Sequence, residues 1–373
     1  MASTSRLTIF SSPGNTVRID QVTPDLVGQD AVGTHILNVQ RAILSRGIES
    51  EIFYEAAAED MLSLGRPIEE MFDLVPDRSL LFQAAIGSPG FDLIRRVNDP
   101  VMIHYHNMTP ASLLESWEPN ISAGVSLGRR QLAAFAPRCS LGLAVSPYNE
   151  RELIDLGYSP TAVAPLLLDM SHDSTQVDHD LLKKLNSQKG PDAPSLLFVG
   201  KVSPHKAPHD LVAMLSALRE LYYPHATLTL VGTPLGTTYL EALESYIAIL
   251  GLEDAVTLAG GISSHELEAY WQSADAFVCA SEHEGFCAPL VEAMGHGVPV
   301  VAFGSSAIPE TIGNAGLVLS QKSPQFFAAA VHRVLRDDTL RSRLIHAGTQ
   351  RAQFFDLEEA TQRFLDTLLT NLL

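Results

Sequence analysis

Two glutamates, Glu284 and Glu292, lie in a stretch whose pattern suits a ligand site. The apolar run 276–280 predicts a buried parallel strand, followed by a polar loop. Pro289 is a suitable first residue for the next helix, and Gly297 a suitable end. Open α/β sheets bind ligands at the carboxyl ends of their strands, and a helix start favours phosphate. Because carboxylates accept hydrogen bonds from hydroxyls, the pattern suits a nucleotide sugar.

Each glutamate taken alone also has an ordinary explanation. Glu284 could be a solvated loop residue, and Glu292 a surface residue of a helix. Their spacing, with Gly285, Phe286 and Pro289 between them, resembles the signature of retaining family 4 glycosyltransferases of the GT-B fold. The match continues into residues 297–301 and into Pro309-Glu310.

This resemblance implies an α/β protein of two Rossmann-like domains facing a central cleft. It implies that Glu284 contacts the transferred sugar, and that Glu292 binds the ribose of the donor. The backbone after Glu284 would bind sugar hydroxyls and phosphate, through Gly285, Phe286, Cys287, Ala288 and Leu290. It also favours attack from the leaving-group face, with Glu284 positioning the sugar instead of acting as a nucleophile.

Two lysines mark a second candidate site. Lys201 and Lys206 follow a strand predicted over 195–200, and no lysine occurs before Lys183. A strand, a turn at Gly200, two cations and a helix start could bind a diphosphate without a metal. The glycine spacing is not that of a Walker loop. The family has an arginine and a lysine at these positions, so Lys201 is a departure that loses bidentate hydrogen bonding.

Other positions are assigned to the donor site by their place in the chain. Gly232 ends a strand predicted over 227–231, and the neighbourhood of Ile262 is expected near the nucleotide base by resemblance. Gly33 begins a helix that ends at Gly47, where it would let a phosphate approach or would serve only the turn. A strand over residues 7–10 and a long loop to Asp30 are expected before this helix.

A histidine pair follows the strand predicted over 101–104. His106 is the better match to a family histidine that contacts donor sugar or acceptor, and His104 is the alternative. The His-x-His pattern also suggests zinc, but no further ligand pair is positioned by sequence to complete such a site. We therefore predict a catalytic group of Glu284, His106, Lys206 and Lys201, with no metal and no cofactor.

Composition excludes several classes of protein. The chain has 373 residues, 25 Lys and Arg against 43 Asp and Glu, and a net charge of −18. This argues against nucleic-acid binding, and a strong membrane-docking face is not expected. Three cysteines, Cys139, Cys279 and Cys287, have no metal-site spacing and predict no disulfide framework. Without a long apolar run, we expect a cytoplasmic enzyme with no transmembrane segment.

The chain is long enough for two domains. We predict an acceptor-binding domain over 1–170, a linker over 171–195 rich in Ser, Asp, Lys, Gly and Pro, and a donor-binding domain over 196–356. A terminal helix over 357–373 completes the first domain by resemblance, or simply ends the second.

The expected reaction is transfer of a hexose-type sugar, with retention, from a UDP- or GDP-sugar to a saccharide acceptor in bacterial glycan synthesis. The alternatives are glycosylation of a small-molecule natural product, a sugar phosphorylase or epimerase on the same fold, and a sugar- or nucleotide-binding protein without catalysis. Oligomeric state is not predicted.

Overall fold

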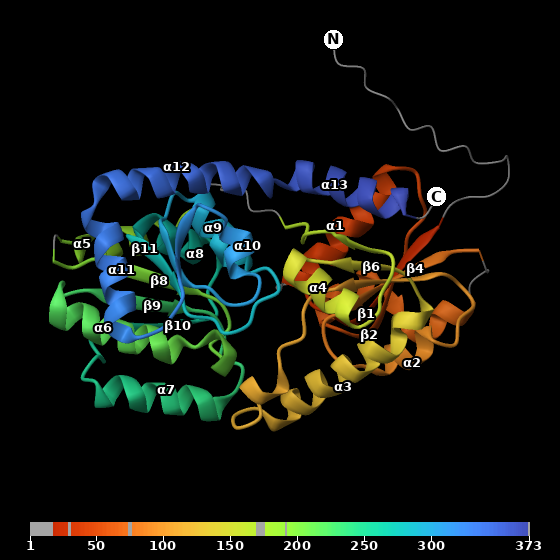
Figure 1. Cartoon of the computed structure of the whole chain (residues 1–373), viewed down its shortest axis with the longest axis horizontal. Helices are drawn as coiled ribbons and strands as arrows, with labels where there is room; N and C mark the ends of the chain where they lie inside the picture. Colours follow the sequence, from red (N-terminus) through yellow and green to blue (C-terminus); the bar gives the residue numbers. More distant parts are fainter. Residues whose placement is uncertain (1–17, 29–30, 74–76, 169–175, 191, 372–373) are drawn as a thin grey trace, which may run out of the picture.

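The computed structural model describes residues 18–28, 31–73, 77–168, 176–190 and 192–371. It has two lobes, each built around one parallel sheet with helices packed against it (Figure 1). The prediction of two Rossmann-like α/β domains is confirmed.

The first lobe contains a sheet of order β3-β2-β1-β4-β5-β6-β7. The strands are β1 (Ile19–Leu26), β2 (Ile52–Ala57), β3 (Arg66–Pro67), β4 (Ser79–Ala84), β5 (Val101–Tyr105), β6 (Cys139–Ala144) and β7 (Thr161–Val163). The α-helices are α1 (Ala31–Ser45), α2 (Pro89–Ile94), α3 (Pro119–Phe135) and α4 (Pro147–Asp155). Short 3-10 segments cover Glu59–Leu64, Ile68–Asp73, Ala111–Leu113 and Ala136–Arg138.

The second lobe contains a sheet of order β10-β9-β8-β11-β12-β13. The strands are β8 (Ser195–Val199), β9 (Thr227–Val231), β10 (Val256–Gly260), β11 (Ala276–Cys279), β12 (Val300–Phe303) and β13 (Gly316–Leu319). The α-helices are α5 (His179–Ser187), α6 (Pro208–Leu221), α7 (Thr237–Ile249), α8 (Ser264–Ser273), α9 (Ala288–Gly295), α10 (Ile308–Ile312), α11 (Pro324–Arg336) and α12 (Asp338–Phe354). The last helix of the chain, α13 (Leu357–Thr370), packs on the first lobe. A 3-10 segment covers Pro204–Lys206.

The strand β1 corrects the predicted N-terminal region. A loop was expected to reach Asp30, but β1 lies within it and pairs with both β2 and β4 in the middle of the sheet. The strand expected over residues 7–10 lies outside the described residues. Polar residues and Pro24 concealed β1, because proline is rare in central strands. The carboxylate of Asp20 is buried and pairs with Arg18 and Arg78.

The predicted linker contains a helix. The helix α5 lies inside the segment 171–195, and its first N–H groups are capped by the side chain of Asp178. The backbone N–H of Asp178 donates to the carbonyl of His265 at 3.0 Å, which joins this end of α5 to α8. A polar composition rich in turn-forming residues therefore also accommodates a short surface helix.

The C-terminal helices connect the two lobes. The helix α12 runs along the second lobe and α13 continues along the first (Figure 1). Phe364, Leu365 and Leu368 of α13 are buried in one apolar cluster with Val39 of α1 and Leu81 of β4. Burial of such side chains contributes about 1.5–3 kcal/mol each, so α13 is an integral part of the first lobe's packing.

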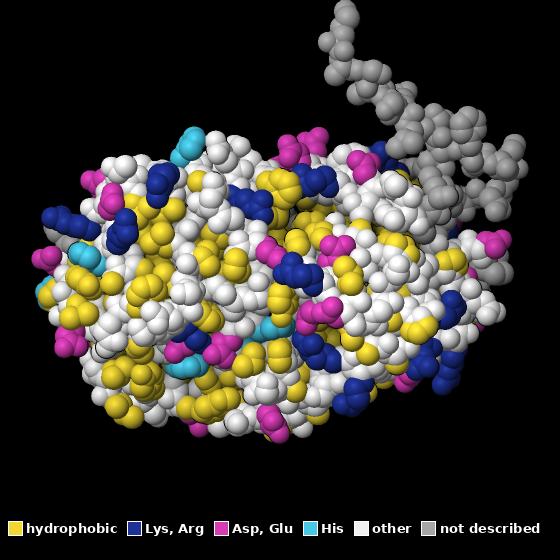
Figure 2. Space-filling model, viewed as in Figure 1, with side chains coloured by type: hydrophobic (Ala, Val, Ile, Leu, Met, Phe, Trp, Pro, Cys, Tyr) yellow, Lys and Arg dark blue, Asp and Glu magenta, His cyan; other side chains and the backbone are white. Residues whose placement is uncertain are grey.

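Among the described residues, no helix is long and apolar enough to cross a membrane. On the face shown in Figure 2, lysine and arginine side chains are interspersed with aspartate and glutamate.

Candidate active site

The loops that carry the predicted donor residues meet where the strand order of the second sheet reverses. The strands β8 and β11 are neighbours, although β9 and β10 intervene in sequence. Their carboxyl ends therefore bring the turn at residues 200–206 beside the Glu284 loop, which comprises residues 281–287. The N–H of Glu282 donates to the carbonyl of His205 at 2.8 Å, which joins the two loops directly. Ligands of open α/β sheets bind at such a switch point.

Lys206 and Glu284 form a close ion pair at this point. The ammonium Nζ of Lys206 donates to both carboxylate oxygens of Glu284, each at 2.6 Å. Burial alone would lower the pKa of Lys206, but the charge and hydrogen bonds of Glu284 outweigh it and leave that pKa raised. The N–H of Glu284 donates to Ser306 Oγ at 2.7 Å, which fixes the backbone of the loop. The structure thus brings together two predicted catalytic residues, separated by 78 positions in sequence.

The loop residues after Glu284 offer mainly backbone to a ligand. The side chains of Phe286 and Leu290 are 4% and 0% exposed and belong to the core of the second lobe. Cys287 is the N-cap of α9 in a left-handed conformation, with φ of 66°. The helix begins at Ala288, one residue earlier than predicted.

Glu292 lies within α9 and is half-buried. Burial raises the pKa of its carboxyl to about 7. No hydrogen bond to this carboxyl from another described residue is found. Its oxygens therefore remain available as acceptors for ligand hydroxyls.

The turns after β8 and β9 approach each other closely. A Cβ atom on Gly232 would lie 2.1 Å from the carbonyl oxygen of Gly200, so the second turn requires glycine. Both residues have positive φ, 148° and 140°. Lys201, which follows Gly200, is exposed, and Ile262 is half-buried after β10. All four lie at the edge of the sheet that holds Lys206.

The first lobe contacts the Glu284 loop through the turn after β5. A Cβ atom on Gly285 would lie 2.5 Å from Cβ of Asn107 and 2.9 Å from the carbonyl oxygen of His106. Nδ2 of Asn107 donates to Nδ1 of His283 at 3.0 Å. His106 therefore lies next to the predicted donor site, whereas His104 is fully buried. Gly33 is in the first turn of α1 and is buried.

Three histidines of the first lobe form a buried group, which we call the histidine cluster: His35, His104 and His106. The N–H of Leu167 donates to Nδ1 of His35, so the proton of that ring is on Nε2. Nε2 of His35 is 3.0 Å from Nδ1 of His104, whose Nε2 donates to the carbonyl of Ala164 at 2.9 Å. Burial lowers the pKa of each ring, to about 4 for His104.

The ring nitrogens of the histidine cluster lie within 4.8 Å of one another, which is close enough for a metal. The hydrogen bonds of His35 and His104 nevertheless argue against metal binding there. A metal on Nε2 of His35 would place the ring proton on Nδ1, against the N–H of Leu167. Residue spacing alone could not indicate His35, because α1 supplies it from 69 positions before His104.

His106 is held by a separate hydrogen-bond chain. Nε2 of His106 lies 2.6 Å from Oε1 of Gln83, whose amide donates to Oε1 of Gln21 at 2.8 Å. The amide of Gln21 donates in turn to the carbonyl of Ile36. The order of donors leaves Nδ1 of His106 as an acceptor, and it is buried with no partner among the described residues.

Comparisons with known proteins agree with this geometry. The profile of the family "Glycosyl transferases group 1" matches residues 182–351. The D-inositol 3-phosphate glycosyltransferase of Kineococcus radiotolerans is 29% identical over 311 residues, which cover 78% of this chain and 69% of that protein. Its counterpart in Frankia alni is 34% identical over 174 residues, covering 44% of this chain and only 42% of the relative.

Two solved structures share the arrangement of both lobes. Anabaena HepE in complex with UDP and glucose has a TM-score of 0.73 at 18% identity, covering 95% of this chain and 100% of that one. Sucrose-phosphate synthase of Thermosynechococcus elongatus has a TM-score of 0.72 at 19% identity, covering 95% and 99%. The chain has the GT-B fold, and the match of residues 182–351 to the family profile supports a glycosyltransferase.

A further contact between the two lobes involves Glu310. Its carboxylate accepts from the N–H of Tyr148 at 2.7 Å, at the start of α4, and pairs with Arg151 at 2.5 Å. An anion at a helix start is favourable. In the sequence Glu310 stands out only as part of a motif, and nothing in its spacing indicates a partner in the other lobe.

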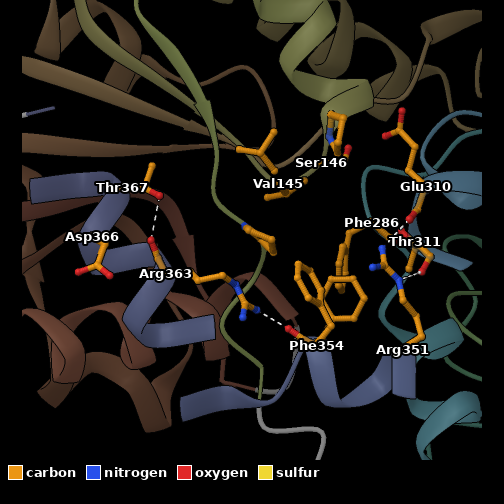
Figure 3. A pocket seen from close by; sticks show the side chains of 14 residues that line it. Val145, Ser146, Phe286, Glu310, Thr311, Arg351, Phe354, Arg363, Asp366 and Thr367 are labelled. Carbon is orange, nitrogen blue, oxygen red and sulfur yellow. Dashed lines mark hydrogen bonds between the residues drawn. The ribbon is translucent and has the colours of Figure 1, made fainter. Parts of the chain in front are cut away.

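A cavity of about 510 Å³ lies between the two lobes, behind the Glu284 loop (Figure 3). Val145 and Ser146 line it from the first lobe, and Phe286 from the loop itself. Arg351 of α12 donates to the carbonyls of Glu310 and Thr311 beside it. Phe286 lines this cavity, whereas the other residues predicted to bind the donor, Lys206 and Glu284 among them, do not. The cavity is therefore separate from the Lys206 side of the loop.

Proposed function

We propose that this glycosyltransferase transfers a hexose-type sugar from a UDP- or GDP-sugar to a saccharide hydroxyl, with retention of configuration. The observation that carries the proposal is the ion pair of Lys206 and Glu284 at the switch point of the second sheet. A cation for a diphosphate and a carboxylate for sugar hydroxyls are thereby held side by side. The similar HepE structure, a complex with UDP and glucose, supports the same donor class.

The proposed diphosphate site consists of cations and close backbone. Lys206 and the exposed Lys201 supply positive charge to the phosphates. Gly200 and Gly232 keep side chains away from the floor of the site, where a Cβ atom could not fit at Gly232. Gly33 faces the donor from the first lobe in this proposal. Preorganised positive charge stabilises the leaving diphosphate, which is a large part of catalysis by such sites.

The sugar and nucleoside are assigned to the Glu284 loop and α9. Glu284 and the backbone of residues 285–288 bind the transferred sugar and its phosphate, with the backbone of Leu290 beside them. Glu292 accepts from the ribose hydroxyls, and Ile262 lies against the base. His106 is assigned to the sugar from the first lobe, where its backbone carbonyl lies beside Gly285.

The geometry favours a positioning role for Glu284. Both of its carboxylate oxygens accept from Lys206 at 2.6 Å, and these bonds withdraw charge from the atoms that would attack an anomeric carbon. We therefore propose attack by the acceptor on the face from which the diphosphate leaves. Retention is tested by NMR of the product, whose anomeric coupling reports its configuration. An inverted product would refute the assignment.

A second acceptor class is favoured by the relatives. Those from Kineococcus radiotolerans and Frankia alni are named for D-inositol 3-phosphate, and a cyclitol phosphate offers hydroxyls of the same kind as a saccharide. Release of UDP or GDP from the donor, measured with each acceptor in turn, separates the two classes. Turnover with inositol phosphate alone would replace the saccharide proposal.

The donor proposal is tested by calorimetric titration with UDP, GDP and ADP in buffer that contains a chelator. We expect one nucleotide to bind, more weakly to Lys206→Ala and Glu292→Ala. Lys184→Ala is a matched control, because Lys184 is an exposed lysine of α5 that does not lie at this edge of the sheet. Failure of all three nucleotides to bind would refute the nucleotide-sugar proposal.

A further inference from the structure

Two of the three cysteines meet beneath the proposed sugar site. Cys279 ends β11 and is 1% exposed, whereas Cys287 caps α9 and is half-buried. Their sulfur atoms lie within 4.8 Å of each other and of a carboxylate oxygen of Glu284. Both thiols are free. The fold therefore makes a dithiol that sequence spacing did not indicate, and Glu284 lies in the loop between its two members.

Cys287 occupies a backbone conformation that suits glycine better. Its φ of 66° and ψ of 70° are in the left-handed region. That conformation costs a residue with a Cβ atom about 1–2 kcal/mol. Strained residues of this kind are enriched at functional sites. The strain comes from the Cβ atom of Cys287, and the thiol that this atom carries lies close to the sulfur of Cys279.

The surroundings favour one thiolate in the pair. The hydrogen bond with Cys287 lowers the pKa of the Cys279 thiol, and the same bond together with burial raises the pKa of Cys287. The ammonium of Lys206 acts in the opposite direction on Cys287 and favours its thiolate. Thiolate character is therefore favoured on Cys279, whereas the half-buried Cys287 is the sulfur that a small oxidant can reach.

Metal binding by Cys279, Glu284 and Cys287 is less favoured than oxidation of the two thiols. Both oxygens of Glu284 already accept from Lys206, so a cation would have to displace a bound ammonium from a buried carboxylate. Oxidation of the two thiols needs no such displacement.

We propose that Cys279 and Cys287 form a reversible disulfide when the protein meets hydrogen peroxide, and that the disulfide distorts the Glu284 loop. The Cys287 thiol first gives up its proton, and the thiolate so formed attacks one peroxide oxygen; the O–O bond breaks, and a sulfenic acid and hydroxide form. The Cys279 thiolate then attacks the Cys287 sulfur, an S–S bond forms, and a second hydroxide leaves. The two thiol protons and two hydroxides make two molecules of water, so peroxide is reduced and the thiols are oxidised.

The disulfide must shorten the distance between the sulfurs to about 2.05 Å. This pulls the start of α9 toward the end of β11, with Glu284 against both sulfurs. The pairing of Lys206 with Glu284 changes as a result. The effect on donor binding rests on the proposed function, whereas formation of the disulfide does not.

The experiment treats the full chain with hydrogen peroxide and then with dithiothreitol. Mass spectrometry of intact protein and of peptides should show loss of two hydrogens and a link between residues 279 and 287. We expect UDP affinity to fall about tenfold, equivalent to the loss of one charge-assisted hydrogen bond, and to return on reduction. Cys139→Ala is the matched control, because Cys139 lies in β6 of the other lobe, and it should respond like the unaltered protein.

Cys279→Ala should retain UDP binding before treatment and show no tenfold loss after it. Cys279→Ser is a second variant should the alanine change unfold the protein. A different product, such as sulfinic acid on Cys287 without the link, would overturn the proposal, and so would a complete link with unchanged UDP affinity. Should the reduced protein bind neither UDP nor GDP, the donor assignment fails, while the peptide link still tests the disulfide.

Discussion

Replacing Lys206 by methionine should destabilise the protein more than any exposed ion pair could. The side chains of Lys206 and Glu284 are 21% and 7% exposed. At 2.6 Å their attraction is about 6 kcal/mol for an effective dielectric constant of about 20. Desolvation offsets much of this, but a buried charge left without its partner typically costs about 3–5 kcal/mol. We therefore expect Lys206→Met to lower stability by about 3 kcal/mol.

The assay is a double-mutant cycle in thermal unfolding at neutral pH. Lys206→Met and Glu284→Gln are measured singly and together, and a loss of about 3 kcal/mol corresponds to a Tm lower by about 6–12 °C. The double variant has no unpaired charge, so it should be more stable than the sum of the single effects by about 2 kcal/mol. Arg66→Met, which breaks exposed pairs with Glu51 and Glu70, is the control and should cost about 1 kcal/mol or less.

Additive effects of Lys206→Met and Glu284→Gln would refute the reasoning, because they would mean that the ion pair contributes no coupling. A Tm loss in Arg66→Met as large as in Lys206→Met would refute the argument from burial. Lys206→Arg retains a cation and should keep part of both the stability and the nucleotide affinity. Loss of one charge-assisted bond to a diphosphate would weaken UDP binding by about 10- to 150-fold in Lys206→Met.

Three further outcomes are expected. Burial raises the pKa of Glu292 to about 7, so the fraction of its anionic form should increase from about pH 6 to 8. UDP affinity measured by calorimetry should rise over the same range, and it should not rise in Glu292→Gln. Gly285→Ala should lower kcat/KM by at least about tenfold with little change in circular dichroism, because its Cβ would lie 2.5 Å from Asn107; full activity would contradict this. Glu310→Ala should lower kcat/KM about tenfold by leaving the N–H of Tyr148 without its acceptor, and Glu310→Gln, which can still accept, should lose less.

The fold of the second lobe was largely predictable from its sequence. Its strands are apolar runs that end in glycine or polar turns, and β11 and α9 begin within one residue of their predicted starts. The first lobe was harder, because β1 carries Asp20, Gln21 and Pro24 into the middle of a sheet. Those polar residues are satisfied by partners from distant segments, such as Arg78 for Asp20, and single-sequence patterns do not contain that information.

Some residues of the candidate site were likewise predictable from the local sequence, whereas their contacts with distant segments were not. Motif spacing indicated Glu284 and Glu292, and local composition indicated Lys206. The bidentate bond between Lys206 and Glu284 depends on strand order, which brings β8 beside β11 and is invisible to local periodicity. His35 was missed for the same reason, because α1 carries it to His104 across the first sheet. The assigned ligand roles remain predictions.

Contacts between the lobes imply that the proposed sugar site is completed only when both lobes are in place. Gly285 packs against Asn107, and His283 of the same loop accepts from the amide of Asn107. Glu310 of α10 accepts a hydrogen bond from the N–H of Tyr148 at the start of α4. Since these contacts lie on the first-lobe side of the loop and Lys206 lies on the other, any movement of the lobes must change the surroundings of Glu284. Donor and acceptor binding should therefore be coupled through this loop, with an affinity for either ligand that depends on the presence of the other.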